Sequence, residues 1–147
     1  MSQKIQSSNI RDLALRLLAY EATARNSSEE NTAPVVRVSE KLRRPLSALA
    51  GASAFRVLLA RALILAKAQV PTLSAVQVQP DGSLDGLSQV PNDQAEEGGV
   101  MLIAHLIGLL VAFIGNKLTL HMVLDLWPDL PGSISELQKE SEYDPTR

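Results

Sequence analysis

Apolar residues recur at intervals of three and four along most of the chain, the spacing that places them on one face of an α-helix. A first helix is expected to begin near Ser8 or Asn9, because either side chain can accept a hydrogen bond from an amide of the first turn. Its apolar stripe consists of Ile10, Leu13, Ala14, Leu17 and Leu18. The pattern predicts an amphipathic helix with one buried face.

A second amphipathic stripe begins after a polar loop over residues 25–34. It consists of Val35, Val38, Leu42, Leu46 and Leu49. We expect Pro45 to kink or break this helix, because proline supplies no amide and its ring crowds the preceding turn. Gly51 is a natural end for the helix, and Ser53 is a natural start for the next one.

The third predicted helix, over residues 54–69, is apolar on most of its circumference and is expected to be well buried. Beyond Pro71, apolar and polar residues alternate around Pro80, Asp81 and Gly82. That alternation and those turn residues predict a small β-hairpin near residues 75–85. Residues 88–99 are mostly polar and are expected to form a connector.

The most apolar stretch covers residues 100–114. At ~1.5 Å per residue such a helix is roughly 22 Å long, shorter than the ~30 Å hydrocarbon layer of a membrane. A bilayer span is therefore disfavoured, and we expect a central core helix that the other helices surround. A shorter helix over residues 117–126 follows, closed by Trp127 and Pro128.

Small residues recur every four positions on this central helix, at Ala104, Gly108 and Ala112. Such a stripe lets a second helix approach closely. We therefore predict a helix contact there, either within the chain or across a dimer axis. His105 lies next to this stripe and is expected to be a packed histidine, bonded to a backbone carbonyl or to water.

Composition agrees with a helical bundle. The 147 residues are 46% hydrophobic and 20% charged, with only five aromatics, a balance that favours packed helices over a β-sandwich. We predict an all-α fold, a compact bundle of about five helices around the central helix at residues 100–114. Residues 1–131 are expected to form one domain, and residues 132–147 a polar, flexible C-terminal tail.

Charge is divided unequally along the chain. Residues 1–70 hold eleven Lys and Arg against five Asp and Glu, whereas residues 71–147 hold three against eleven. Such polarity favours attraction between the two halves or between two copies, and secondarily binding to an acidic partner. The sequence has no cysteine and no secretory pattern at its start, so we expect a cytoplasmic protein without disulfides.

No catalytic constellation is found in the sequence. The two histidines, His105 and His121, form no HExxH motif, and Asp125, four residues after His121, makes at most a pair with it. Glycine loops that bind phosphate and the GxSxG elbow of serine hydrolases are absent as well. We expect no enzymatic activity, no metal and no cofactor.

Two overlapping segments resemble known families. Residues 39–51, "SEKLRRPLSALAG", resemble the phosphoacceptor box of sensor histidine kinases. Glu40 stands where that family has its phosphorylated histidine, so the resemblance implies at most a dimerising helical hairpin. Residues 46–63, "LSALAGASAFRVLLARAL", resemble a helix-turn-helix. Candidate contacts to anions or nucleic acid in this basic half are Arg37, Lys41, Arg44 and Arg56.

A broader resemblance joins residues 55–68, "FRVLLARALILAKA", with residues 108–128, "GLLVAFIGNKLTLHMVLDLWP". Together they are similar to a pattern in uncharacterised bacterial proteins. The resemblance implies a bacterial, soluble, free-standing domain, and it transfers no site, substrate or partner.

These observations predict a non-catalytic interaction or regulatory module. It is expected to self-associate as a homodimer or to dock a helical protein partner. Two alternatives stay open: a DNA-binding regulator that uses the basic N-terminal half, and a membrane-associated protein that uses the apolar helix over residues 98–115.

Overall fold

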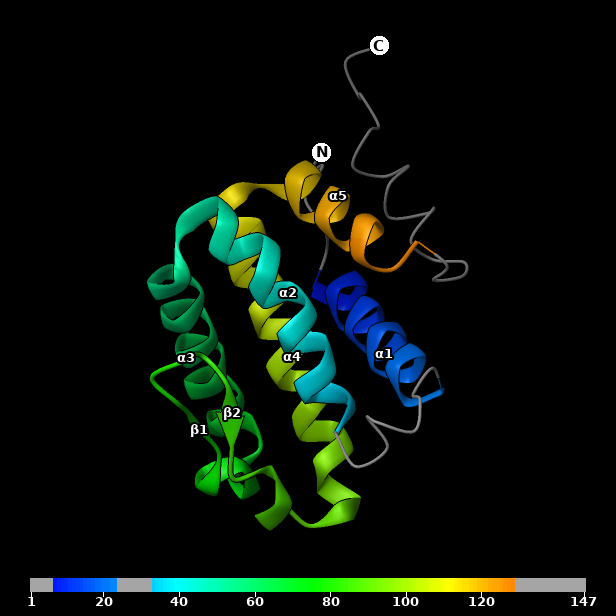
Figure 1. Cartoon of the computed structure of the whole chain (residues 1–147). Helices are drawn as coiled ribbons and strands as arrows, with labels where there is room; N and C mark the ends of the chain where they lie inside the picture. Colours follow the sequence, from blue (N-terminus) through cyan, green and yellow to red (C-terminus); the bar gives the residue numbers. More distant parts are fainter. Residues whose placement is uncertain (1–6, 24–32, 129–147) are drawn as a thin grey trace.

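The computed structural model describes residues 7–23 and 33–128, and this part of the chain forms five α-helices and a two-stranded sheet (Figure 1). The helices are α1 (Ser7–Thr23), α2 (Pro34–Ala50), α3 (Ala52–Gln69), α4 (Asn92–Ile114) and α5 (Asn116–Leu126). The short elements are the 3-10 helices η2 (Pro71–Ala75) and η3 (Leu87–Gln89) and the strands β1 (Gln77–Val78) and β2 (Leu84–Asp85). The predicted all-α bundle with a small hairpin is confirmed. The predicted tail at residues 132–147 and most of the predicted loop at residues 25–34 lie outside the described residues.

The central element is α4. α2 lies across one side of it, α1 and α3 flank it, and α5 follows at its C-terminal end, where it also contacts α2 (Figure 1). The buried residues of α4 are Val100, Leu102, Ile103, Leu106, Ile107 and Leu110. They join one apolar cluster that includes Leu13, Leu17, Leu42, Leu46, Phe55, Leu59 and Trp127. Burial of this cluster is the main term that favours the folded state.

α2 continues through Pro45 to Ala50, so of the kink or break expected at Pro45, the break does not occur. Pro45 removes one backbone hydrogen bond, but Leu42 and Leu46 on either side of it are fully buried. Their packing against the core holds the last turns of the helix. The chain then turns at Gly51, whose φ of +98° is a conformation that glycine adopts without strain.

The hairpin packs on the first turns of α3. Its antiparallel register pairs Gln77 with Asp85 and Val78 with Leu84. A Cβ at Gly82 in the turn would lie 3.5 Å from the ring of Phe55, and Arg56 Nη1 donates a hydrogen bond of 3.0 Å to the carbonyl of Pro80. These contacts give the ribbon the support that an isolated two-stranded sheet lacks.

α4 begins at Asn92, so most of the polar segment expected to be a connector is helical. Gly98 and Gly99 stand at the end of the expected connector, but both glycines are buried at close helix contacts. A Cβ at Gly98 would lie 2.7 Å from Leu73 Cδ2, and one at Gly99 would lie 3.4 Å from Val35 Cβ. The glycines therefore let α4 approach η2 and α2 closely.

One side of α3 is exposed, so the prediction of a well-buried helix is wrong. The core side of α3 consists of Phe55, Leu59, Ala62, Leu63 and Ala66. On the other side, Val57 is 62% exposed and Ile64 is 65% exposed. α2 and α4 cover only part of a helix that is apolar nearly all round.

Candidate functional site

One side of α4, between α1 and α3, is only partly covered by these helices. A groove of about 380 Å³ follows it, bounded by Ile10 and Arg11 of α1 and by Leu65 and Gln69 of α3. The α4 residues on this side, here called the open face, are Met101, Ala104, His105, Gly108, Leu109, Ala112 and Phe113. None of them is fully buried, and the open face is apolar apart from His105.

The predicted small-residue stripe lies on the open face. A Cβ built at Gly108 would meet no atom within 4 Å, Ala112 is exposed, and Ala104 is partly buried. No helix in the described part of the chain therefore packs closely at Gly108. The helix contact predicted at this stripe stays a prediction for a second molecule.

His105 lies one turn before Leu109 on the open face. Its Nε2 is 2.7 Å from Oε1 of Gln69, so the neutral ring donates a hydrogen bond to a side-chain amide of α3, in place of the expected backbone carbonyl or water. Burial lowers the pKa of His105 below its ordinary value of 6.5, because desolvation disfavours the imidazolium. Burial therefore favours the neutral ring, which adds no charge to the open face.

A buried carboxylate joins three segments elsewhere in the bundle. Glu21 of α1 is only 2% exposed. Its Oε1 lies 3.3 Å from Nε of Arg37, and its Oε2 lies 2.5 Å from Nζ of Lys41. Nε1 of Trp127, just after α5, donates a hydrogen bond of 2.8 Å to the same Oε2. Glu21, Arg37, Lys41 and Trp127 are called the Glu21 cluster below.

Aromatic rings add to this cluster. Nζ of Lys41 lies 5.7 Å from the ring centre of Tyr20 and 5.4 Å from the ring centre of Trp127. Both distances fall within the ~6 Å over which a cation and an aromatic face attract each other. Lys41 therefore has a carboxylate and two rings as partners, although its side chain is partly exposed.

The Glu21 cluster accounts for two of the four predicted anion contacts. Arg37 and Lys41 both pair with Glu21. Together with Arg44, which is exposed, they line a cavity of about 420 Å³. Arg56 lies at the hairpin instead, bonded to the carbonyl of Pro80. The structure therefore groups three of the predicted basic residues and separates the fourth.

Sequence reasoning missed the role of Glu21, although a signal was available. Glu21 follows Leu17 and Leu18 at the four- and three-residue spacing of the buried stripe of α1. An acidic residue in such a stripe requires a cation or several donors beside it. The identity of those partners depends on how α2 and the end of α5 pack on α1, which local spacing does not specify.

The described residues contain no group of three or more His, Asp or Glu that could hold a metal ion. His121 and Asp125 both lie exposed on α5 and form no ion pair with each other in this part of the chain. His105 has Gln69 beside it rather than a carboxylate. No acid-base pair or ligand set is therefore assembled around either histidine among the described residues.

Most of α4 meets the length and composition of a membrane span. Residues Gln94–Ile114 have a most apolar window of mean hydropathy 2.1, and 44% of that window is buried inside the bundle. The argument from length against a membrane span was made for residues 100–114 alone. The helix begins at Asn92 and is therefore longer than that stretch. Length and composition alone do not separate a membrane helix from a core helix.

Comparison with known proteins gives no assignment: the sequence matches no protein-family model, and no curated protein or solved structure matches it. This agrees with the resemblance to proteins of unassigned function, whereas a bacterial origin stays a prediction.

Proposed function

We propose that this protein is a non-catalytic helical interaction module, located in the cytoplasm, that self-associates through the open face of α4. The observation that carries the proposal is an apolar helix side that the described elements cover only in part from Met101 to Phe113, with Ala112 and Phe113 exposed. A contiguous apolar surface of this kind on a soluble domain marks a contact site, because its exposure to water is unfavourable.

The spacing of small residues favours a second copy as the occupant. Ala104 and Ala112 lie four residues before and four residues after Gly108. In an antiparallel pair with a two-fold axis at Gly108, Ala104 of one copy lies against the partner's Ala112, and the contact is repeated by symmetry. Such self-complementarity is what a two-fold interface requires. The space around Gly108 then allows close approach of the two backbones.

The DNA-binding alternative has less support. Arg37 and Lys41 are engaged by Glu21, and Arg56 is engaged by the carbonyl of Pro80. The exposed side of α3 carries Val57 and Ile64, whereas base edges are read by polar side chains. Membrane association, the other alternative, would use the same open face. Sedimentation in buffer without detergent separates it from self-association.

The test is sedimentation equilibrium of the full chain in buffer without detergent. We expect a dimer for the unaltered protein and a monomer for Ala112→Glu, because a dimer would bury an unpaired charge, which weakens association by roughly tenfold or more. The matched control is Ala48→Glu, which makes the same change at an exposed position of α2 and should leave the dimer intact.

Three results would contradict the proposal. They are a monomer at every concentration, equal association of Ala112→Glu and the unaltered protein, and a protein that stays in solution only with detergent and sediments with lipid vesicles. The last result would favour the membrane alternative.

A further inference from the structure

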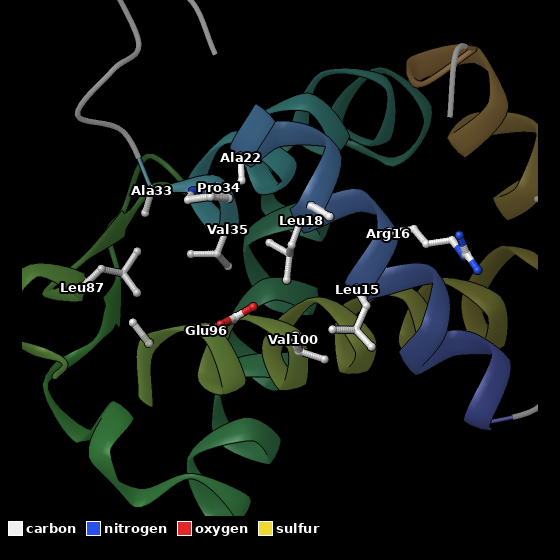
Figure 2. Close-up of a pocket in the computed structure, with 13 residues that line it drawn as sticks. Leu15, Arg16, Leu18, Ala22, Ala33, Pro34, Val35, Leu87, Glu96 and Val100 are labelled. Atoms are coloured by element: carbon white, nitrogen blue, oxygen red, sulfur yellow. The ribbon is translucent and has the colours of Figure 1, made fainter. Parts of the chain in front are cut away.

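A third hollow lies between α1, the start of α2 and the first turns of α4 (Figure 2). Its volume is about 680 Å³, within the ~300–1,000 Å³ that small-molecule sites occupy. The space exists because small residues line it, namely Ala19, Ala22, Ala33, Ala95 and Gly99. Leu18, Val35 and Val100 supply larger apolar walls.

In the described part of the chain, two charged side chains border this cavity, and they differ in orientation. In Figure 2, Arg16 extends away from the apolar walls, whereas Glu96 lies among the labelled apolar side chains. Nε of Arg16 is 3.0 Å from Oδ2 of Asp12, so its charge is offset by a neighbour. Within the described part of the chain, Glu96 forms no ion pair. Among its described lining residues, the cavity therefore combines apolar walls with one negative charge that has no ion-pair partner.

We propose that this cavity binds a small amphiphile with an apolar body and a cationic amine head. The body fills the space between Leu18, Val35 and Val100, which removes apolar surface from water. The ammonium head pairs with the carboxylate of Glu96, a residue that is exposed to solvent, so the head keeps part of its hydration. The cavity shares no lining residue with the open face, and the inference does not rest on self-association.

The test is calorimetric titration of the full chain with decyltrimethylammonium, decanol and decanoate, each kept below its micelle-forming concentration. The three probes share one alkyl chain and differ in head charge. We expect the cation to bind tightest and the anion weakest, with about a fivefold difference between the cation and the neutral alcohol, as for a partly exposed ion pair. The alcohol isolates the contribution of the apolar walls.

Two kinds of variant separate the head from the walls. Glu96→Gln should bring the affinity for decyltrimethylammonium down to that for decanol. The control is Glu97→Gln, because Glu97 is exposed and does not line the cavity, and this variant should keep the affinity of the unaltered protein. Ala95→Leu should weaken all three probes by filling the space, with circular dichroism to check that the variant is folded.

The proposal is overturned if decanoate binds tightest or if no probe binds. It is also overturned if Glu96→Gln keeps the preference for the cation, or if a folded Ala95→Leu binds all probes as before.

Discussion

The Glu21 cluster and the open face of α4 differ in which side chains they remove from water. In the Glu21 cluster, a carboxylate and a guanidinium are removed from water, and the carboxylate is matched by two cations and an indole N–H. On the open face, apolar side chains remain partly in water, and the one polar side chain, His105, is bonded to Gln69.

This difference separates contacts that are fixed from contacts that can form and dissociate. A buried charge is stable only when its partners are in place, so the Glu21 cluster specifies one arrangement of α1, α2 and the end of α5. Apolar surface is non-directional in its attraction, so the open face can pair with another chain and separate from it again. The comparison predicts large effects on stability at the first region and effects on association at the second.

The largest effect is expected for Glu21→Gln. It removes the buried charge that Arg37, Lys41 and Trp127 share, and the free energy of unfolding should fall by about 3–5 kcal/mol in urea denaturation. The matched control is Asp12→Asn, which removes the exposed ion pair with Arg16 and should cost at most about 1 kcal/mol. If the two variants lost equal stability, the Glu21 cluster would have no special role in fixing the helices.

Smaller effects on the free energy of unfolding, opposite in sign to each other, are expected at two glycines of α4. Gly98→Ala should lower the free energy of unfolding by about 1–2 kcal/mol, because the new Cβ displaces the buried Leu73, a cost partly offset by better helix propensity. Gly108→Ala meets no atom and should raise it by about 0.5–1 kcal/mol. Thermal unfolding of dilute protein measures both, and a loss of stability for Gly108→Ala would show that the open face is already covered.

The smallest effect is a dependence of association on pH. Burial lowers the pKa of His105, so the folded chain binds a proton less readily than the unfolded chain. The contribution of His105 to the free energy of unfolding is therefore full above about pH 6.5 and is lost as the pH falls below that value toward the lowered pKa. Arg11 borders the same groove as a permanent cation, so protonation there also adds like charge to the open face. Self-association should weaken several-fold between about pH 7.5 and about pH 5.5.

His105→Gln is the control for this prediction. It keeps a side chain that can hydrogen-bond to Gln69 and removes the titratable group, so its association should not respond to pH over this range. An equal pH response in His105→Gln and in the unaltered protein would assign the effect to another group.

Much of the fold could be predicted from periodicity. The apolar stripes of α1 and α2 and the turn residues around Gly82 identified elements that the structure contains. The start of α4 was missed because residues 88–99 are mostly polar, and only the positions of Leu73 and Val35 reveal why the helix has glycine at residues 98 and 99. Pro45 failed to break α2 because buried neighbours outweigh one lost hydrogen bond.

The candidate sites could be predicted less well, since they depend on which helices meet. The spacing of Ala104, Gly108 and Ala112 identified a contact stripe but did not distinguish a neighbour in the bundle from a second copy. The cavity beside Glu96 arises from alanines on α1, just before α2 and on α4, and no local pattern links them. Long-range packing decides both features.

The most direct test of the proposed two-fold contact uses the absence of cysteine from the sequence. In the proposed dimer, the two-fold axis lies at residue 108, so Gly108→Cys places the two new sulfurs next to each other. A disulfide requires the Cα atoms to be about 4.4–6.8 Å apart. Under mild oxidation we predict a covalent dimer for Gly108→Cys and a monomer for Ala48→Cys, an exposed position on α2. No cross-link at Gly108→Cys, or equal cross-linking in the two variants, would contradict self-association through the open face of α4.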